Sequence, residues 1–320
     1  MRLLLPALLT LAACGSTTDK DTVGNTCVAS IDEVVFDDGT TDVYNRAVLW
    51  VELDDATSGE LTLTGPDGDV AGSTQALDDD IFHFVADTPL SPNTSYELGI
   101  GADGCEIDTI GFTTSEVGDA LADLSTLTGR TWRIALRDGT PPPMAKANQA
   151  VIDLINEDLL LTVTSVDGTN AEIISGSSTT ADGPQDACVP TTPLTLDLSA
   201  NPFGTAELAA GYASLQGVAV PTYGGSVNGS FNSDGSALVG VQLTQVLDMA
   251  TAAIIIGEDP CELLVAVGGS CEPCPSGDGD CLTFQAWELT GVEDTAAAAV
   301  VARSEEEVAN DPACQSGTGS

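Results

Sequence analysis

The sequence predicts a mainly β protein: a β-sandwich followed by a β-rich domain, either a barrel or a second sandwich, with one or two inserted helices. Apolar and polar residues alternate along many short segments, which is the pattern of strands with one buried face. Gly, Pro, Asn and Asp interrupt these segments at intervals of roughly 8 to 12 residues, as turns do in all-β domains. The length of 320 residues exceeds that of one ordinary domain, about 100 to 200 residues, and therefore predicts two domains.

The N-terminus has the features of an export signal. Arg2 precedes an apolar run at residues 3–11, which is shorter than the about 20 residues needed to cross a bilayer. The run ends in Leu-Ala-Ala-Cys14, which resembles the lipobox of bacterial lipoproteins. The resemblance implies that residues 1–13 are removed, that Cys14 is lipidated, and that residues 14–26 tether the protein to the outer membrane or cell surface. An ordinary secretory signal with an unmodified cysteine is the alternative.

The chain has nine cysteines, an odd number for an exported protein. Assigning Cys14 to the lipid leaves eight, which suits up to four disulfides in an oxidising compartment. Cys27 and Cys105 lie near the two ends of the first domain and are expected to pair. The other six, whose pairing the sequence leaves open, are Cys188, Cys261, Cys271, Cys274, Cys281 and Cys314. The four from Cys261 to Cys281 could instead bind zinc, and Cys271 to Cys274 could form a redox pair. Disulfides are preferred because a closed zinc ribbon usually has two C-x-x-C steps, and this stretch has one.

Residues 27–115 are assigned to the first domain by their alternating strands. Within them, the segment from Pro89 to Leu98 resembles the Leu-x-Pro-x-Thr-x-Tyr signature of fibronectin type III and bacterial immunoglobulin-like domains. The resemblance implies that Leu90 and Tyr96 form a tyrosine corner, with the phenol bonded to the backbone and the ring in the core.

The position of Trp50 favours the bacterial immunoglobulin-like variant. Type III modules have an early core tryptophan, whereas Trp50 lies on the strand face opposite Leu49 and Val51.

Residues 116–128 are expected to be a connector, 129–302 a disulfide-stapled β domain, and 303–320 an acidic tail, mobile except where Cys314 holds it. Predicted strands lie at 131–137, 159–166, 170–176, 192–198, 215–220, 225–232, 236–244 and 281–290, and predicted helices at 147–155 and 246–267. The start, Gly129 to Trp132, resembles the Gly-x-Trp opening of lipocalins with the spacing shifted by one, which implies a ligand cavity as an alternative function. The whole layout resembles uncharacterised lipoproteins of myxobacteria, which implies no activity.

Charge and composition exclude two classes of protein. Eight Lys and Arg against 49 Asp and Glu give a net charge of −41, so no basic face exists for a nucleic acid. The 42% hydrophobic content supports a folded core rather than disorder throughout. The single histidine, His83, lies in an apolar strand, and no G-x-S-x-G motif occurs. We therefore expect that the protein has no catalytic residues, no cofactor and no enzymatic activity. The enzymatic alternative is a carbohydrate hydrolase that uses carboxylates.

Two weak binding features remain. Arg133 and Arg137 share a strand face and could contact an anion, although they could equally neutralise nearby acids. Acidic turns at Asp78–Asp80, Asn232–Gly235 and Asp278–Asp280 could bind calcium weakly, but none completes an EF-hand loop and solvated turns are the simpler interpretation. The sequence thus predicts a non-enzymatic, lipid-anchored envelope protein for adhesion, structural support or binding of an envelope protein or polysaccharide. The alternative is a small-molecule binder with a lipocalin-like cavity.

Overall fold

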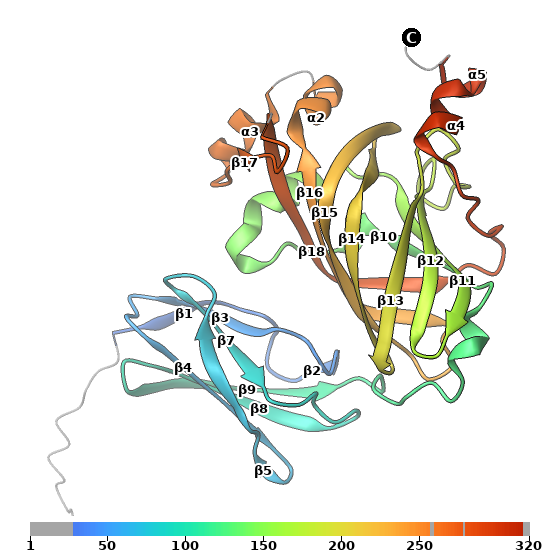
Figure 1. Cartoon of the computed structure of the whole chain (residues 1–320). Helices are drawn as coiled ribbons and strands as arrows, with labels where there is room; N and C mark the ends of the chain where they lie inside the picture. The colour runs from blue at the N-terminus through green and yellow to red at the C-terminus, as the bar shows by residue number, and fades with distance from the viewer. Residues whose placement is uncertain (1–27, 257–258, 278, 316–320) are drawn as a thin grey trace, which may run out of the picture.

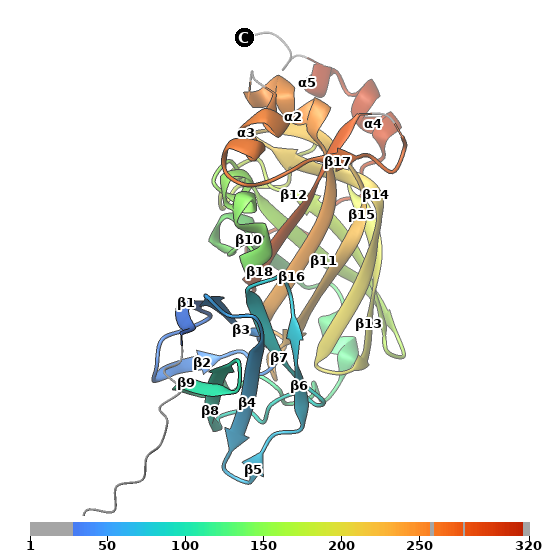
Figure 2. The same ribbon diagram turned by 90° about the vertical axis from the view of Figure 1, so that its left-hand side faces the viewer.

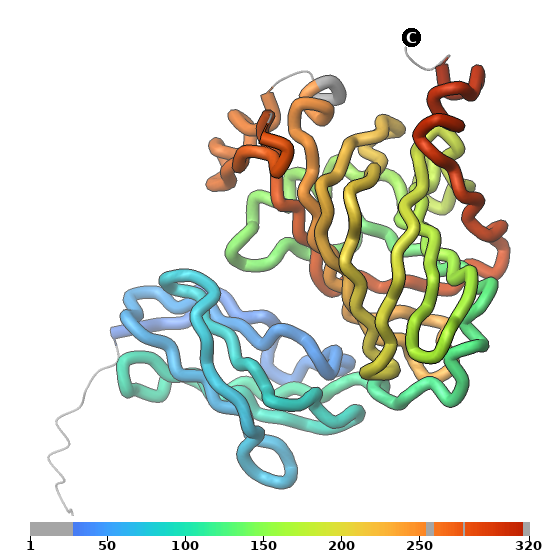
Figure 3. Tube along the Cα trace, in the orientation of Figure 1, coloured from blue at the N-terminus to red at the C-terminus, as the bar shows by residue number. Residues whose placement is uncertain are grey.

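The computed structural model of the chain describes residues 28–256, 259–277 and 279–315, and it confirms the mainly β fold (Figure 1). A two-sheet sandwich is followed by a closed barrel, with a few short helices. The single connection between the two domains, after the last strand of the sandwich, can be followed in Figure 3. The predicted signal, the predicted lipidation site Cys14 and the predicted disulfide partner Cys27 lie outside the described residues. Within the described residues, no helix has the length and apolar character that a bilayer crossing requires.

The sandwich has two sheets that enclose one core. The first sheet has the strand order β1 (Ser30–Val34), β3 (Leu49–Asp54), β7 (Ile81–Ala86) and β6 (Gly72–Ala76). The second has the order β2 (Thr40–Val43), β9 (Cys105–Thr114), β8 (Ser95–Ala102), β4 (Gly59–Gly65) and β5 (Gly68–Asp69). Leu90 and Tyr96 are both buried in this core, and the Tyr96 hydroxyl accepts a hydrogen bond from the Ser91 N–H at 2.9 Å. The Tyr96 ring therefore packs in the core while its hydroxyl is bonded to the backbone five residues upstream.

The second domain is an antiparallel barrel in which each strand pairs with the next and the last pairs with the first (Figure 2). Its strands are β10 (Thr131–Ala135), β11 (Asp158–Asp167), β12 (Asn170–Ser177), β13 (Thr192–Ala200), β14 (Phe203–Leu215), β15 (Val218–Phe231), β16 (Ala237–Asp248) and β18 (Asp280–Glu293). The short β17 (Glu272–Pro273) adds to β18 outside the ring. Pairing of Ile134 with Gly291 closes the ring, so the second domain is a barrel rather than a sandwich.

The barrel interior is packed with apolar side chains. Trp132 is buried, its ring meets that of Phe231 edge-on at 5.2 Å, and its indole N–H donates to the Gly235 carbonyl at 3.0 Å. Leu127, in the short helix η1 (Leu124–Leu127) before the first barrel strand, is fully buried in the same core. The indole hydrogen bond matters because an unpaired buried N–H would cost free energy.

One predicted strand is wrong. Residues 215–220 span a hairpin turn, in which Gln216 and Gly217 adopt φ of 51° and 75° between β14 and β15. Two successive residues with positive φ are typical of the tight turns that join antiparallel strands. The sequence pattern did not predict the 13-residue strand β14, because this strand is rich in Ala and Gly rather than in β-branched residues.

The helices follow the sequence pattern with shorter spans. The predicted helix at 147–155 is the 3₁₀ segment η3 (Pro143–Asn148) followed by one turn, α1 (Gln149–Ile152), after another 3₁₀ turn, η2 (Leu136–Asp138). The predicted stretch 246–267 contains the end of β16 and then α2 (Met249–Ile256) and α3 (Pro260–Ala266). Pro260 begins α3, where its missing N–H removes no hydrogen bond.

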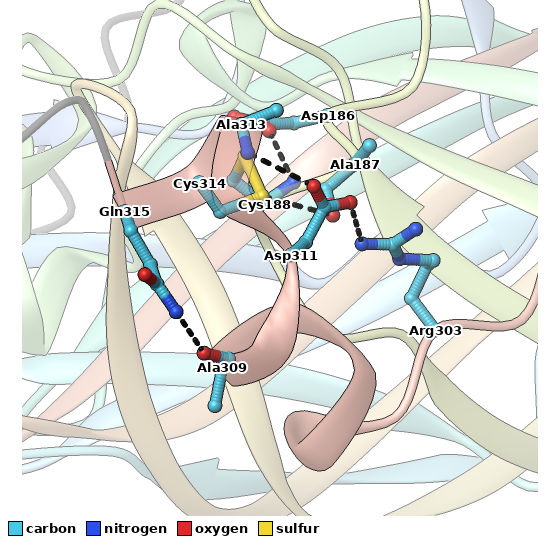
Figure 4. The surroundings of a disulfide bond; sticks show 9 residues. All are labelled: Asp186, Ala187, Cys188, Arg303, Ala309, Asp311, Ala313, Cys314 and Gln315. Atoms are coloured by element: carbon cyan, nitrogen blue, oxygen red, sulfur yellow. Dashed lines mark hydrogen bonds and ion pairs between the residues drawn. A yellow bond between two sulfur atoms is a disulfide. The ribbon is translucent and has the colours of Figure 1, made fainter.

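Three disulfides join described cysteines: Cys188–Cys314, Cys261–Cys271 and Cys274–Cys281. The last two join the four cysteines from Cys261 to Cys281, so no thiolate of this group remains to bind zinc. The first holds the C-terminal segment, which forms α4 (Glu305–Asn310) and α5 (Pro312–Gln315) rather than an irregular tail. A capping box between Ser304 and Glu307 begins α4. Figure 4 shows Cys314 bonded to Cys188, with the pair of Arg303 and Asp311 beside it. In this pair the Arg303 guanidinium donates to the Asp311 carboxylate at 2.8 Å.

Candidate functional site

The two domains meet where Tyr44, directly after β2, packs on the barrel. Its ring lies over Gly240 of β16, and its hydroxyl is hydrogen-bonded to the Ser230 hydroxyl at 2.7 Å. Burial raises the pKa of the Tyr44 hydroxyl, and the bond to Ser230 only partly opposes this. Gly240 has a φ of 61°, and a Cβ atom there would lie 2.2 Å from the Tyr44 ring. Only glycine fits this contact.

Further contacts join the domains around Tyr44. The Arg46 guanidinium lies 4.2 Å from the centre of the Phe203 ring. In the connector, the Leu121 N–H donates to the Asn201 side-chain oxygen, and the Asn201 amide donates back to the Leu121 carbonyl, both at 2.9 Å. These contacts have defined distances and partners, so the sandwich and the barrel pack against each other through a specific interface.

A cleft of about 660 Å³ lies between the domains, beside the Tyr44 contact. Ligand sites typically have about 300 to 1,000 Å³ and often lie at domain interfaces. The sandwich contributes β1, β3 and the segment around β2, and the barrel contributes β16, β18 and the segment from Thr140 to Gln149. The two flanking domains can be seen in Figure 1.

Aromatic side chains are concentrated in this cleft. Aromatic residues make up only 4% of the chain, yet the cleft is lined by Phe36, Tyr44, Trp50 and Trp287. Trp50 points away from the sandwich core, as its strand position predicted, because its neighbours Leu49 and Val51 are buried while Trp50 is half-buried. Of the three tryptophans, Trp132 belongs to the barrel core, and the other two both line the cleft.

The placement of Glu288 depends on an irregularity in β18. Val241 pairs with Leu289 and Leu243 with Ala286, so β18 has one residue more than β16 between these pairs. Glu288 has a φ of 58° at this bulge, an unusual value for a residue other than glycine. Strand alternation would send Trp287 and Glu288 to opposite faces, yet both line the cleft.

Glu288 is exposed to solvent as a residue, while its carboxylate is partly desolvated by burial. This desolvation raises the pKa of Glu288, and a weak hydrogen bond from the Thr140 hydroxyl, at 3.4 Å, acts in the opposite direction. Among the described residues, no cation pairs with this carboxylate. No local sequence pattern indicated Glu288 or Trp287, because the bulge that brings them together depends on pairing between distant strands.

The cleft is acidic. Its described lining includes the carboxylates of Glu33, Asp42 and Glu288, and Lys146 is its one lining cation. The Lys146 ammonium is already engaged, since it donates to Glu52 at 2.6 Å and lies 3.0 Å from Glu33. These bonds raise the pKa of Lys146, the bond to Glu52 most strongly, and they join the barrel side of the cleft to the sandwich.

The predicted anion contacts, Arg133 and Arg137, lie outside this cleft and are paired with acids. Arg133 contacts Asp158 and Asp294, both at 2.8 Å, and Arg137 contacts Asp158 at 2.5 Å. The Asp158 side chain is fully buried. Burial alone would raise the pKa of Asp158, but hydrogen bonds from Arg137, the Asp182 N–H and Arg133 together lower it. An anionic ligand would therefore have to displace carboxylates.

The barrel interior offers little room. Two cavities of about 50 and 40 Å³ share Ser214, whose buried hydroxyl has no hydrogen-bond partner among the residues that the structure describes. Cavities of this size hold a few water molecules and are far smaller than the about 300 Å³ of a small ligand site.

The remaining candidates from the sequence, His83 and the acidic turns, are not part of the described cleft lining. His83 lies opposite Trp50 in the strand register, outside the described cleft lining, and burial lowers its pKa. In the part of the chain that the structure describes, no three or more His, Cys, Asp or Glu side chains form a metal-binding group. Asp278 of the third predicted calcium turn lies outside the described residues. Comparison with known proteins found no matching family model and no matching curated protein.

Proposed function

We propose that this chain is a non-enzymatic, exported and lipid-anchored envelope protein that binds a polysaccharide in the cleft between its two domains. The observation that carries the proposal is that both tryptophans outside the core line this one cleft. Sugar rings have flat faces of C–H groups, which pack well against the electron-rich faces of aromatic rings. Carboxylates beside the rings can accept hydrogen bonds from sugar hydroxyls.

The sandwich is proposed to be an immunoglobulin-like domain. In chain order its sheets correspond to the A-B-E-D and C-F-G arrangement of that family, with β2 added beside β9. The Tyr96 hydrogen bond to Ser91 supports the same assignment. The sandwich would then provide one wall of the binding site as well as a spacer from the membrane.

The anchor is proposed from the lipobox-like sequence ending at Cys14. Lipid chains contribute about 0.8 kcal/mol for each buried CH₂, so the diacyl group expected on Cys14 would hold the body at a membrane. Cys14→Ser should release the protein from the membrane fraction. Continued membrane attachment of this variant would contradict the anchor.

A small-molecule binder remains the second candidate. The observation that favours it is the buried Ser214 hydroxyl in the barrel, for which the described part of the chain provides no hydrogen-bond partner. The cavities there have about 50 and 40 Å³, so a ligand could enter only if the packed interior opened. The interdomain cleft needs no such rearrangement, and we prefer it for this reason.

The test of the proposed function is the binding of envelope polysaccharides to Trp50→Ala and Trp287→Ala, measured by affinity electrophoresis. Each substitution removes a ring that contributes about 2 kcal/mol to binding, so the dissociation constant obtained from the retardation should rise by about 30-fold. Tyr223→Ala, a half-buried aromatic residue outside the described cleft lining, is the control and should bind like the wild type. Unchanged binding by both folded tryptophan variants would contradict the proposal.

A further inference from the structure

We infer that the ligand of the cleft carries free amino groups, as a polymer of de-N-acetylated amino sugars does, and that Glu288 binds one ammonium group. The inference rests on the proposed function and specifies the chemical class of its ligand. It depends on the charges of the cleft, on the position of Glu288 beside Trp287, and on the aromatic rings.

The charge balance of the cleft selects against anionic and neutral glycans. Glu33 is already paired with Lys146, whereas Asp42 and Glu288 have no cationic partner among the described residues. An anionic sugar would place like charges together. A neutral sugar would replace the water around Glu288 with hydroxyl hydrogen bonds only, and would bring no opposite charge to the carboxylate. An ammonium group on the sugar compensates that charge directly.

The bulge in β18 presents an acid and an aromatic ring from adjacent residues. Trp287 and Glu288 both line the cleft, and Glu288 adopts its φ of 58° to do so. Backbone conformations of this kind are concentrated at binding sites. An amino sugar has the matching combination, because its ring presents an apolar face and its amino group projects from the edge of that ring.

The aromatic rings favour the same ligand. Trp50, Trp287, Tyr44 and Phe36 all line the cleft. A cation near the face of an aromatic ring is attracted by the ring quadrupole, most strongly for tryptophan. An ammonium group beside Glu288 would therefore be stabilised by a carboxylate and by the aromatic walls together.

The experiment must separate this site from general attraction, because a chain with a net charge of −41 attracts any polycation. We would use two tetrasaccharides with the same β-1,4 linkage, one of glucosamine with free amines and one of N-acetylglucosamine. Binding to the full chain would be measured by calorimetry at about pH 6 in 0.5 M NaCl, where long-range attraction is screened within about 4 Å.

The wild type should bind the free-amine tetrasaccharide at least about 10-fold more tightly than the acetylated one. Glu288→Gln should reduce this ratio to near one, because it removes the charge that attracts the free-amine tetrasaccharide and that opposes binding of the acetylated one. Glu97→Gln is the matched control, because it removes the same charge from an exposed position of β8 outside the described cleft lining. It should retain the ratio of the wild type.

Three outcomes would overturn the inference. Equal binding of both tetrasaccharides by the wild type would reject the amino-group specificity while leaving the cleft as a glycan site. Equal effects of Glu288→Gln and Glu97→Gln would assign the preference to overall charge. Failure of the wild type to bind either tetrasaccharide would also reject it, and the tryptophan variants with envelope polysaccharides would then decide the proposed function separately.

Discussion

Substitution of Gly240 by alanine should disrupt the interface between the two domains, because the Tyr44 ring packs directly against this glycine. The added Cβ atom would lie 2.2 Å from a carbon of the Tyr44 ring, whereas carbon atoms in contact lie about 3.5 to 4.0 Å apart. The ring would have to retreat by more than 1 Å, and its 2.7 Å hydrogen bond to Ser230 would be lost. That bond contributes about 1 kcal/mol, and the φ of 61° adds a strain of about 1 kcal/mol for alanine.

The two contributions can be separated by a double-mutant cycle with Tyr44→Ala, measured by urea denaturation. In the wild-type background, Gly240→Ala should cost about 2 kcal/mol or more. In the Tyr44→Ala background, where no ring opposes the new Cβ, only the backbone strain of about 1 kcal/mol should remain. Small-angle scattering of Gly240→Ala should show a larger maximum dimension as the domains separate. The same cost in both backgrounds would show that the contact between Gly240 and the Tyr44 ring contributes nothing to stability.

Two further predictions concern stability. Asp158→Asn leaves Arg133 and Arg137 without their buried partner and should cost about 3 kcal/mol in urea denaturation at pH 7. The pKa of Asp158 is lower in the folded state than in the unfolded state, where it is about 3.9. Its contribution to the free energy of unfolding is therefore complete above pH 3.9 and disappears as the pH falls through the folded-state pKa. The variant should accordingly lose less stability than the wild type between pH 5 and pH 2. Replacing Cys188 and Cys314 together by serine opens a link across 126 residues and should cost about 2 to 5 kcal/mol. Limited proteolysis should then cleave α4 and α5 first, and a resistant C-terminus would argue against this role of the disulfide.

The sequence predicted those parts of the fold that depend on neighbouring residues. Alternation along Leu49, Trp50 and Val51 predicted both the buried face of β3 and the outward position of Trp50. Pro260 correctly marked the break between α2 and α3. In both cases a single residue or a short pattern determines the local geometry.

Features that depend on distant contacts could not be predicted. Closure of the barrel requires β10 to pair with β18 across the whole domain, and no local pattern distinguishes a closed barrel from two packed sheets. Ala and Gly gave β14 no strand signal, although its neighbours hold it in the sheet. The pairing of six cysteines likewise depended on the folded chain.

The candidate site belongs to this second class. Trp50 could be identified as an exposed aromatic residue, but its neighbours in the cleft come from a different domain. Trp287 and Glu288 line the cleft together because of a bulge that is visible only in the register of β16 against β18. The contact of Tyr44 with Gly240, which sets the position of the two walls, joins residues almost 200 positions apart in the chain.

Hydrogen exchange of the full chain, with and without a bound envelope oligosaccharide, would locate the bound ligand. Binding between the domains should slow exchange on both walls of the cleft, in residues 33–50 of the sandwich and in residues 140–149 and 287–290 of the barrel domain. Protection on both walls requires that the ligand lie between the domains. Protection confined to the strands around Ser214, with exchange in the cleft unchanged, would place the ligand in the barrel interior and rule out binding in the cleft.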